Sequence, residues 1–386
     1  MNLKNHQTST IGKGSVQVNV ERICTKNFNT LKEQWLQLEQ HANTDFFLSW
    51  KWIECWLKTI DDNQKIYLVK AKNNNAIVGL GVFVEHNIVR HNLIASKQWF
   101  LHRTGRENKD QIWIENNGFL LNDTYKVEVH DAMWQFLLNH KSNVDEFIVH
   151  VAKKSSDINW DITHKKYHTI NQQQELGYKI PLAGLDCVND YLTQISKNTR
   201  QQFKRSIKHL ALQGEIEFSV IENPQEQIEV LEETKHWHIK KWQSTSTPSG
   251  FENKEFCQFH NSLLNTTHPT ASTVVATLTV DKEIMGCIYC LSENGTIYFY
   301  LSCIKPIDNN KVKLGLIMHI SMVEWLISQG NIYSEYDFLA GDARYKRSLS
   351  SVKNEYLKLI IQKNHLKFTL ELALKKIFTT LKTTGH

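Results

Sequence analysis

The stretch Tyr336-Asp-Phe-Leu-Ala-Gly-Asp-Ala-Arg-Tyr-Lys-Arg347 follows an apolar run that predicts a buried strand. Asp337 lies at the end of that strand, and Gly341 permits a tight backbone turn. Asp342 is then placed to cap a short helix that carries Tyr345. Two carboxylates, a phenol and several cations are thus gathered behind one strand, which is an arrangement expected at a reactive site. A plain strand end, turn and capped helix is the alternative interpretation.

The composition is that of a packed globular protein. Of 386 residues, 41% are hydrophobic, and 11 Trp, 12 Tyr and 17 Phe accompany only 5 Pro. A chain of this length exceeds what one hydrophobic core usually supports, so we expect two domains. The net charge of +5 is modest for this size. It argues against a DNA-binding protein, whereas an anionic small molecule or a lipid head group fits it.

The sequence shows no signal for export and no membrane span. Residues 1–15 are polar, and apolar runs such as 76–84 are far shorter than the roughly 18 residues that a bilayer requires. The 7 cysteines are scattered, which is typical of a reducing compartment. Cys287 and Cys290 form a C-x-x-C motif, but on a strand they would point to opposite faces, which makes a shared metal improbable. We therefore expect a cytoplasmic protein without a metal ion.

The second half of the chain gives the clearer pattern of secondary structure. The predicted order is strand, two helices, a meander of three strands, helix, strand, short helix and strand. Apart from the short helix, these elements are expected near residues 215–221, 224–237, 256–264, 273–280, 284–291, 296–304, 314–325, 332–336 and 356–361.

The first half repeats this order. Its elements are expected near residues 16–23, 28–41, 47–60, 66–71, 77–85, 127–138 and 146–151. Even the turn Asn74-Asn75-Ala76 has a counterpart, Asp281-Lys282-Glu283. A duplication explains the length, with coincidence as the alternative. We predict an α/β protein with a mixed α+β sheet and two tandem domains, 15–180 and 181–365, followed by an amphipathic helical tail at 366–386.

Two stretches resemble the GNAT acyltransferase superfamily. The pattern Asp-Phe-x-x-Gly-Asp-x-x-Tyr-Lys at 337–346 is the more specific one, and the segment 191–205 is similar to the basic helix that opens the carboxyl-terminal domain in one branch. That branch is the CelD-type one, associated with cellulose biosynthesis and related to the FemAB transferases. The resemblance covers about residues 15–365. It implies tandem GNAT-like domains, the amino-terminal one degenerate and the carboxyl-terminal one active.

The resemblance also implies an acyl-CoA donor, with acetyl-CoA the first choice. The pantetheine arm would lie between the fourth and fifth strands of the second domain. Backbone groups of the fourth strand would bind this arm, at Tyr300, Leu301, Ser302 and Cys303. The pyrophosphate would lie at the start of the next helix, where unpaired amides attract anions, with help from Lys311, Lys313 and Gly315. The loop 306–315 keeps only one of the family's glycines, so a solvated connector remains the alternative.

The same resemblance assigns chemistry to residues 336–347. Acyl transfer to an amine needs a base for the ammonium proton and an acid for the leaving thiolate. Tyr345 falls where the family often places the acid, and Asp337 is the first choice for the base or ammonium anchor, with Asp342 or Glu335 next. The expected substrate contacts are Glu335, Arg344 and Lys346. A cap or an ion pair remains the alternative for each aspartate.

Two basic segments are candidates for contact with anionic partners. The predicted helix 196–212 carries cations broadly on one side, namely Lys197, Arg200, Lys204, Arg205 and Lys208. A solvated face is the default interpretation, with CoA phosphates, a glycan-lipid phosphate or tRNA as functional alternatives. The tail 366–386 has a leucine-rich stripe opposite lysines, and it either docks on a domain or makes peripheral contact with an anionic membrane.

These inferences predict a cytoplasmic acyl-CoA-dependent N- or O-acyltransferase. The acceptor implied by the resemblance is an amino or hydroxyl group of a sugar or surface-polysaccharide precursor, with direct transfer in a ternary complex. A FemAB-like transferase that uses charged tRNA is the enzymatic alternative. A non-catalytic GNAT scaffold in polysaccharide synthesis is the third hypothesis, favoured by the glycine-poor loop.

Overall fold

The two halves of the chain repeat one order of elements, as expected. The structure, a computed structural model, describes residues 9–11, 16–24, 28–162 and 164–371. The first half contains β2 (Val16–Ile23), α1 (Asn29–Glu39), α2 (Trp50–Leu57), β3 (Lys65–Asn73), β4 (Ala76–Arg90), β5 (Ile94–Leu101), α4 (Lys126–His140), β7 (Glu146–Lys153) and β8 (Tyr167–Pro181). The second half contains β9 (Ile216–Ile221), α7 (Pro224–Trp242), α8 (Lys254–Asn265), β10 (Ser272–Val280), β11 (Glu283–Glu293), β12 (Thr296–Ile304), α9 (Leu314–Ser328), β13 (Glu335–Ala340) and β14 (Val352–Lys363).

Further elements accompany these repeats. They include β1 (Ser9–Ile11), α3 (Glu107–Asp110), β6 (Leu120–Leu121), α5 (Val188–Gln194), α6 (Lys197–Leu210) and α10 (Arg344–Leu349). The sequence patterns predict neither β5 nor β8. Within the described ranges, no helix combines the length and the apolar character needed to cross a bilayer. Most of the predicted tail, residues 372–386, lies outside the described residues.

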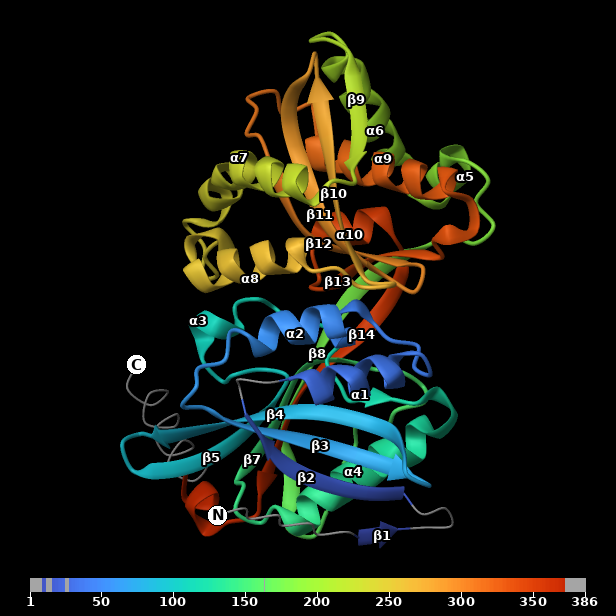
Figure 1. The fold of residues 1–386 in the computed structure, drawn as a ribbon. Helices are drawn as coiled ribbons and strands as arrows, with labels where there is room; N and C mark the ends of the chain where they lie inside the picture. The colour runs from blue at the N-terminus through green and yellow to red at the C-terminus, as the bar shows by residue number, and fades with distance from the viewer. Residues whose placement is uncertain (1–8, 12–15, 25–27, 163, 372–386) are drawn as a thin grey trace.

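One sheet runs through both halves, in the order β1-β2-β3-β4-β5-β7-β14-β8-β13-β12-β11-β10-β9. The last strand of each half crosses into the other half: β8 pairs with β13, and β14 pairs with β7. In Figure 1 the green β8 and the red β14 run together between the blue and the yellow-orange halves. The backbone hydrogen bonds of these two strands therefore join the halves into one body.

Equivalent hairpins in the two halves share their turn geometry. Asn74 and Asn75 join β3 to β4, and Asp281 and Lys282 join β10 to β11, all four with positive φ of 46° to 68°. Two-residue turns of this kind match the right-handed twist of the flanking strands. In each hairpin the pairing register of the two strands also shifts shortly before the turn. This shared detail supports the predicted duplication.

Aromatic side chains hold the halves together away from the sheet. One of three core clusters contains buried residues from both halves. In it, Trp52 of α2 lies 4.8 Å from Phe259 of α8, ring centroid to ring centroid, in an edge-to-face arrangement. The other two clusters lie within one half each, apart from strand residues that cross over. The halves are thus packed together through a desolvated interface, where aromatic pairs contribute beyond their buried area.

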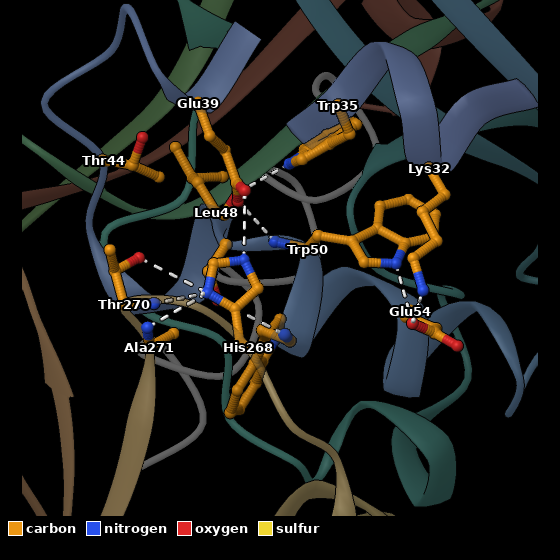
Figure 2. A network of polar contacts seen from close by, with 12 residues as sticks. Lys32, Trp35, Glu39, Thr44, Leu48, Trp50, Glu54, His268, Thr270 and Ala271 are labelled. Carbon is orange, nitrogen blue, oxygen red and sulfur yellow. Dashed lines mark hydrogen bonds and ion pairs between the residues drawn. The ribbon is translucent and has the colours of Figure 1, made fainter. Parts of the chain in front are cut away.

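A polar network completes this interface (Figure 2). Glu39 of α1 accepts a hydrogen bond from the backbone N–H of Trp50, and its other carboxylate oxygen lies 3.1 Å from Nε2 of His268 in the second half. Nδ1 of His268 accepts a hydrogen bond from the N–H of Ala271 at 3.0 Å. Because Nδ1 is an acceptor, Nε2 carries the proton and donates it to Glu39. The two nearly buried side chains therefore fix the loop that leads into β10.

Candidate active site

Strands β12 and β13 run parallel but part after a short stretch of pairing. The pairing ends with Tyr298 opposite Asp337, although β12 continues to Ile304. Tyr300 is skipped in the register between β11 and β12, and Leu339 in β13 has a φ of 61°. Because a bulge bends its strand, these irregularities turn the two strands away from each other. We call this divergence the fork; its closed end is the pair Tyr298 and Asp337.

Asp337, the first choice for the base, is fully buried at the closed end of the fork. One of its oxygens accepts a hydrogen bond from the N–H of Leu339 at 2.7 Å, and the other from Asn354 at 2.9 Å. The ammonium of Lys153 lies 3.8 Å away. Burial raises the pKa of Asp337 to about 6, with Lys153 opposing the rise. The side chain therefore fixes the bend at Leu339, and its role as base stays a prediction.

Tyr345, the predicted acid, lies beside both diverging strands. Its ring stacks on His319 of α9, with centroids 5.6 Å apart and planes inclined by 9°. It also lies 6.4 Å from Phe299 and 6.3 Å from Phe338, the residues that directly follow the closed end of the fork. The residue is partly exposed, and burial of the rest raises its pKa, as does the nearby carboxylate of Glu115. Tyr345 therefore keeps its hydroxyl proton at neutral pH.

Glu115, which sequence reasoning missed, reaches the end of β13 from the first half. Its carboxylate accepts a hydrogen bond of 2.7 Å from the N–H of Ala340. Lys346 donates to the carbonyl oxygens of Ala340 and Leu339 from the other side. Burial raises the pKa of Glu115, while Lys346 opposes the rise. Glu115 lies in a mostly apolar run, Ile-Trp-Ile-Glu-Asn, and nothing local to it signals a partner 225 positions away.

The loop that carries Glu115 also closes the equivalent gap of the first half. There β5 and β7 are parallel and pair over only three positions, as β12 and β13 do. Asn117 bridges them, because its N–H donates to the carbonyl of Val151 in β7 and its side chain donates to the carbonyl of Leu101 in β5. His102 donates from Nδ1 to Asn117 and accepts from Val82, and burial lowers its pKa to about 3. The neutral imidazole thus holds the loop in place.

The predicted anion site lies where α6 meets the start of α9. Helix α9 begins after Lys313, and no side chain at its N-cap accepts a hydrogen bond from the first backbone N–H groups of the helix. Ser206 of α6 accepts a hydrogen bond from the N–H of Lys313 and donates to the carbonyl of Lys311. Both lysines are exposed, and Gly315 is half-buried in the first turn. The structure therefore gathers these predicted residues around one helix start.

The basic face of α6 has mixed roles. Arg200 caps the end of α5 by donating to the carbonyls of Leu192, Thr193 and Ile195. The other predicted cations are exposed, namely Lys197, Lys204, Arg205 and Lys208. Four of the five cations are therefore exposed to solvent, as the default interpretation of this helix face expects.

The side chains of the four predicted β12 residues point mostly into the core. Tyr300 donates its hydroxyl to the carbonyl of Ile112, in the Glu115 loop. Leu301 and Cys303 are buried in the cluster between the halves, and Ser302 is half-buried. Their predicted contribution through backbone groups stays a prediction.

Asp342 does not cap the helix that follows it. The N-cap of α10 is Ala343, so the expected capping is wrong. The chain needs one more residue to turn from Gly341, whose φ is 112°. Asp342 instead accepts a hydrogen bond of 2.7 Å from the hydroxyl of Tyr178 and pairs with Arg347 at 2.6 Å. These contacts fit the alternative interpretation of an exposed ion pair.

The three predicted substrate contacts lie in different surroundings. Glu335, at the start of β13, pairs with Lys179 of β8 at 2.5 Å. Arg344 is exposed, and Lys346 is buried against the end of β13. Cys287 and Cys290 lie in different core clusters. Over the residues that the structure describes, no group of three or more His, Cys, Asp or Glu side chains is arranged to hold a metal.

Taken together, the duplicated order, the parallel fourth and fifth strands and the fork define a tandem acyltransferase-like α/β fold. Residues 197–347 match the family model of the acetyltransferase (GNAT) domain, from the first residue of α6 into α10. These residues are therefore similar to a GNAT acetyltransferase domain, and the expected mixed α/β fold with tandem GNAT-like halves is confirmed. No curated protein matches the sequence.

Two solved structures share the fold over nearly their whole length. FemX covers 88% of this chain and 97% of its own, with a TM-score of 0.55 and 10% identity. The carboxyl-terminal domain of a protein named as a lysylphosphatidylglycerol synthetase, from Agrobacterium fabrum, covers 92% of this chain and 97% of its own, with a TM-score of 0.51 and 10% identity. At this identity the likeness shows the fold alone.

Proposed function

We propose that the protein transfers an acyl group from acyl-CoA to an amino or hydroxyl group of a sugar or surface-polysaccharide precursor. Acetyl-CoA is the first donor to test, and the proposed donor site lies within residues 181–365. One observation above all supports this proposal. Strands β12 and β13 part after Tyr298, and Tyr345 lies beside both of them.

The groups around the fork suit an extended thioester donor. Beyond Tyr298, β12 is no longer paired with β13, so its backbone can bind a pantetheine arm there. The start of α9 has no side-chain cap, and Lys311 and Lys313 add positive charge for a pyrophosphate. In the first half Asn117 already bridges the equivalent gap, which supports a donor site in the second half only.

The proposed reaction needs one base and one acid. The acceptor nitrogen or oxygen bonds to the acyl carbon, and the bond from that carbon to sulfur breaks. Glu115 or Asp337 takes the proton that the acceptor releases, and Tyr345 gives its hydroxyl proton to the departing thiolate. Burial raises the pKa of all three groups. A raised pKa makes a carboxylate a better proton acceptor and keeps the phenol in its donor form.

Isothermal titration with acetyl-CoA and longer acyl-CoA donors tests the proposal. We expect saturable binding by the wild type and turnover with amino-sugar acceptors. Absence of binding by any acyl-CoA would exclude this mechanism and favour the non-catalytic scaffold.

A transferase that uses charged tRNA remains the second candidate. The observation that favours it is the exposed cations of α6 beside the loop 311–313. Phosphate contacts make such binding fall steeply with salt. Filter binding of charged tRNA across ionic strength decides the matter, because no binding or a flat response excludes this candidate. For both candidates we propose a cytoplasmic location, which fits seven cysteines that are all free.

A further inference from the structure

A polar chamber of about 440 Å³ lies where the two halves meet. This volume is within the range of small-molecule sites, about 300–1,000 Å³. Asp45, Asn116 and Lys153 line it from the first half, and Tyr298 and Glu335 from the second. Tyr298 also forms the closed end of the fork. The chamber therefore adjoins the point that the acyl group of an inserted donor would approach.

Contacts across the halves build the wall of this chamber. The hydroxyl of Tyr298 donates to the carboxylate of Asp45 at 2.7 Å, and Asn294 donates to the carbonyl of Thr44 at 2.9 Å. Asp45 precedes a short 3-10 helix, Phe46–Leu48, whose two phenylalanines are packed in the core between the halves. The carboxylate is thus held on a rigid support, as a binding site requires.

Negative charge exceeds positive charge on one side of the chamber. Three carboxylates, those of Asp45, Glu335 and Asp337, lie near the ammonium of Lys153. Burial would lower the pKa of Lys153, but these carboxylates hold it above its usual value. Asp123 and Lys126 add one carboxylate and one ammonium group to the lining, and Lys179 is paired with Glu335. Four carboxylates against three ammonium groups leave room for one further positive charge.

Asn116 adds an unpaired amide to the same wall. The side chain is 4% exposed, and neither its oxygen nor its nitrogen has a hydrogen-bond partner in the part of the chain that the structure describes. Its φ of 48° is one that asparagine tolerates better than most residues. The positive φ therefore explains why asparagine is present at this position, but it does not explain why the side-chain oxygen and nitrogen are buried without a partner. Ligand hydroxyl groups can act as donor and acceptor to this amide.

We infer that this chamber is the acceptor site and that it takes an amino sugar bound as its ammonium form. This inference rests on the proposed function, because it assigns the chamber to the acceptor of that reaction. Asp45 binds the ammonium group, Asn116 binds hydroxyl groups, and the rings of Tyr298 and Trp160 offer apolar surface to the sugar ring. The amine would then lie near the closed end of the fork.

Binding of two sugars without any acyl donor tests the inference. Titration of glucosamine and glucose, followed by saturation-transfer NMR at about pH 7, compares ligands that differ in one amine. Asp45→Asn keeps an oxygen that can accept from Tyr298 but removes the charge. Asp186→Asn, at an exposed aspartate far along the chain, is the matched control. Thermal unfolding of both variants checks that they are folded.

We expect glucosamine to bind at least about tenfold more tightly than glucose, as charged hydrogen bonds usually allow. Asp45→Asn should abolish this difference, and Asp186→Asn should leave it unchanged. Equal binding of the two sugars, no binding of either, or an unaffected Asp45→Asn variant would overturn the inference. Acyl-CoA binding is measured separately, so a protein that binds glucosamine but no acyl-CoA refutes the proposed function and keeps the chamber as a sugar site.

Discussion

A carboxylate oxygen of Glu115, in the first half, accepts a hydrogen bond of 2.7 Å from the backbone N–H of Ala340, in the second half. This contact brings a group with a raised pKa to the end of the strand that forms one side of the fork. The first half therefore supplies part of the site, even though Asn117 bridges its own gap. A tandem arrangement is needed for such a composite site, since one half alone lacks Glu115.

Glu115→Gln should lower turnover by roughly 100-fold or more, the usual contribution of a general base. Glutamine can still accept from Ala340, so the loop should stay in place. In the wild type, kcat/KM should rise with pH through an inflection well above the pKa of about 4.3 of a free glutamate, because the base must lose its proton. The variant should lose this inflection in a pH-rate profile.

Glu252→Gln, at an exposed glutamate, is the matched control and should leave the profile unchanged. If Glu115→Gln keeps both its rate and its inflection, the base is Asp337 or another group.

Tyr345→Phe should separate binding from chemistry. The ring still stacks on His319, so we expect acetyl-CoA affinity within about twofold of the wild type. Loss of the proton donor should lower kcat by roughly 100-fold or more. Tyr333→Phe, a half-buried tyrosine that packs on Trp325, serves as the control. A normal kcat in Tyr345→Phe would remove this residue from the mechanism.

Asp337→Asn should change how stability depends on pH. The folded pKa of about 6 exceeds the value of about 3.9 in an unfolded chain, so the folded state binds this proton more tightly. The protonated Asp337 therefore stabilises the folded state at low pH, and this contribution to the free energy of unfolding is lost as the pH rises through about 6. A difference of about 2 in pKa corresponds to about 3 kcal/mol. As the pH rises from about 4 to 7, the free energy of unfolding of the variant should increase relative to that of the wild type by up to this amount, as measured by urea unfolding. Parallel pH profiles of the two proteins would contradict the assignment.

Replacing Lys311 and Lys313 together by alanine should weaken acyl-CoA binding by about three- to tenfold. Exposed ion pairs contribute little each, and salt screens them, so the loss should shrink at high ionic strength. The same double change at Lys240 and Lys254, both exposed on other helices, is the control. An equal loss in the control pair would show a general charge effect instead of an anion site.

The order of elements could largely be predicted from local patterns. Alternating apolar residues predicted β9, and strand-like runs separated by turn residues predicted β10 to β12. The Asn74–Asn75 and Asp281–Lys282 turns marked equivalent hairpins. The strand β8 escaped prediction because residues 171–175 read Asn-Gln-Gln-Gln-Glu, a polar run without the usual signature. Its strand conformation comes from pairing with β14 and β13 on either side.

The site could be predicted only in part. Tyr345 lies next to the fork and the Lys311–Lys313 loop lies at the start of α9, while their roles stay predictions. The helix cap at Asp342 was wrong, because capping depends on where the turn from Gly341 ends. Glu115 and Asp45 were missed, since their partners Ala340 and Tyr298 lie in the other half.

By itself, the sequence determined the repeated α/β order and the hairpin turns, and it indicated the stretch 336–347 as a candidate active site. These features follow from residue spacing within about ten positions, which fixes the faces of helices and strands. Only the tertiary structure decided that β8 and β14 cross between the halves, that the fork opens at Tyr298, and that Glu115 meets Ala340. Such contacts depend on hydrogen bonds and packing between segments far apart in the chain, and no local period encodes them.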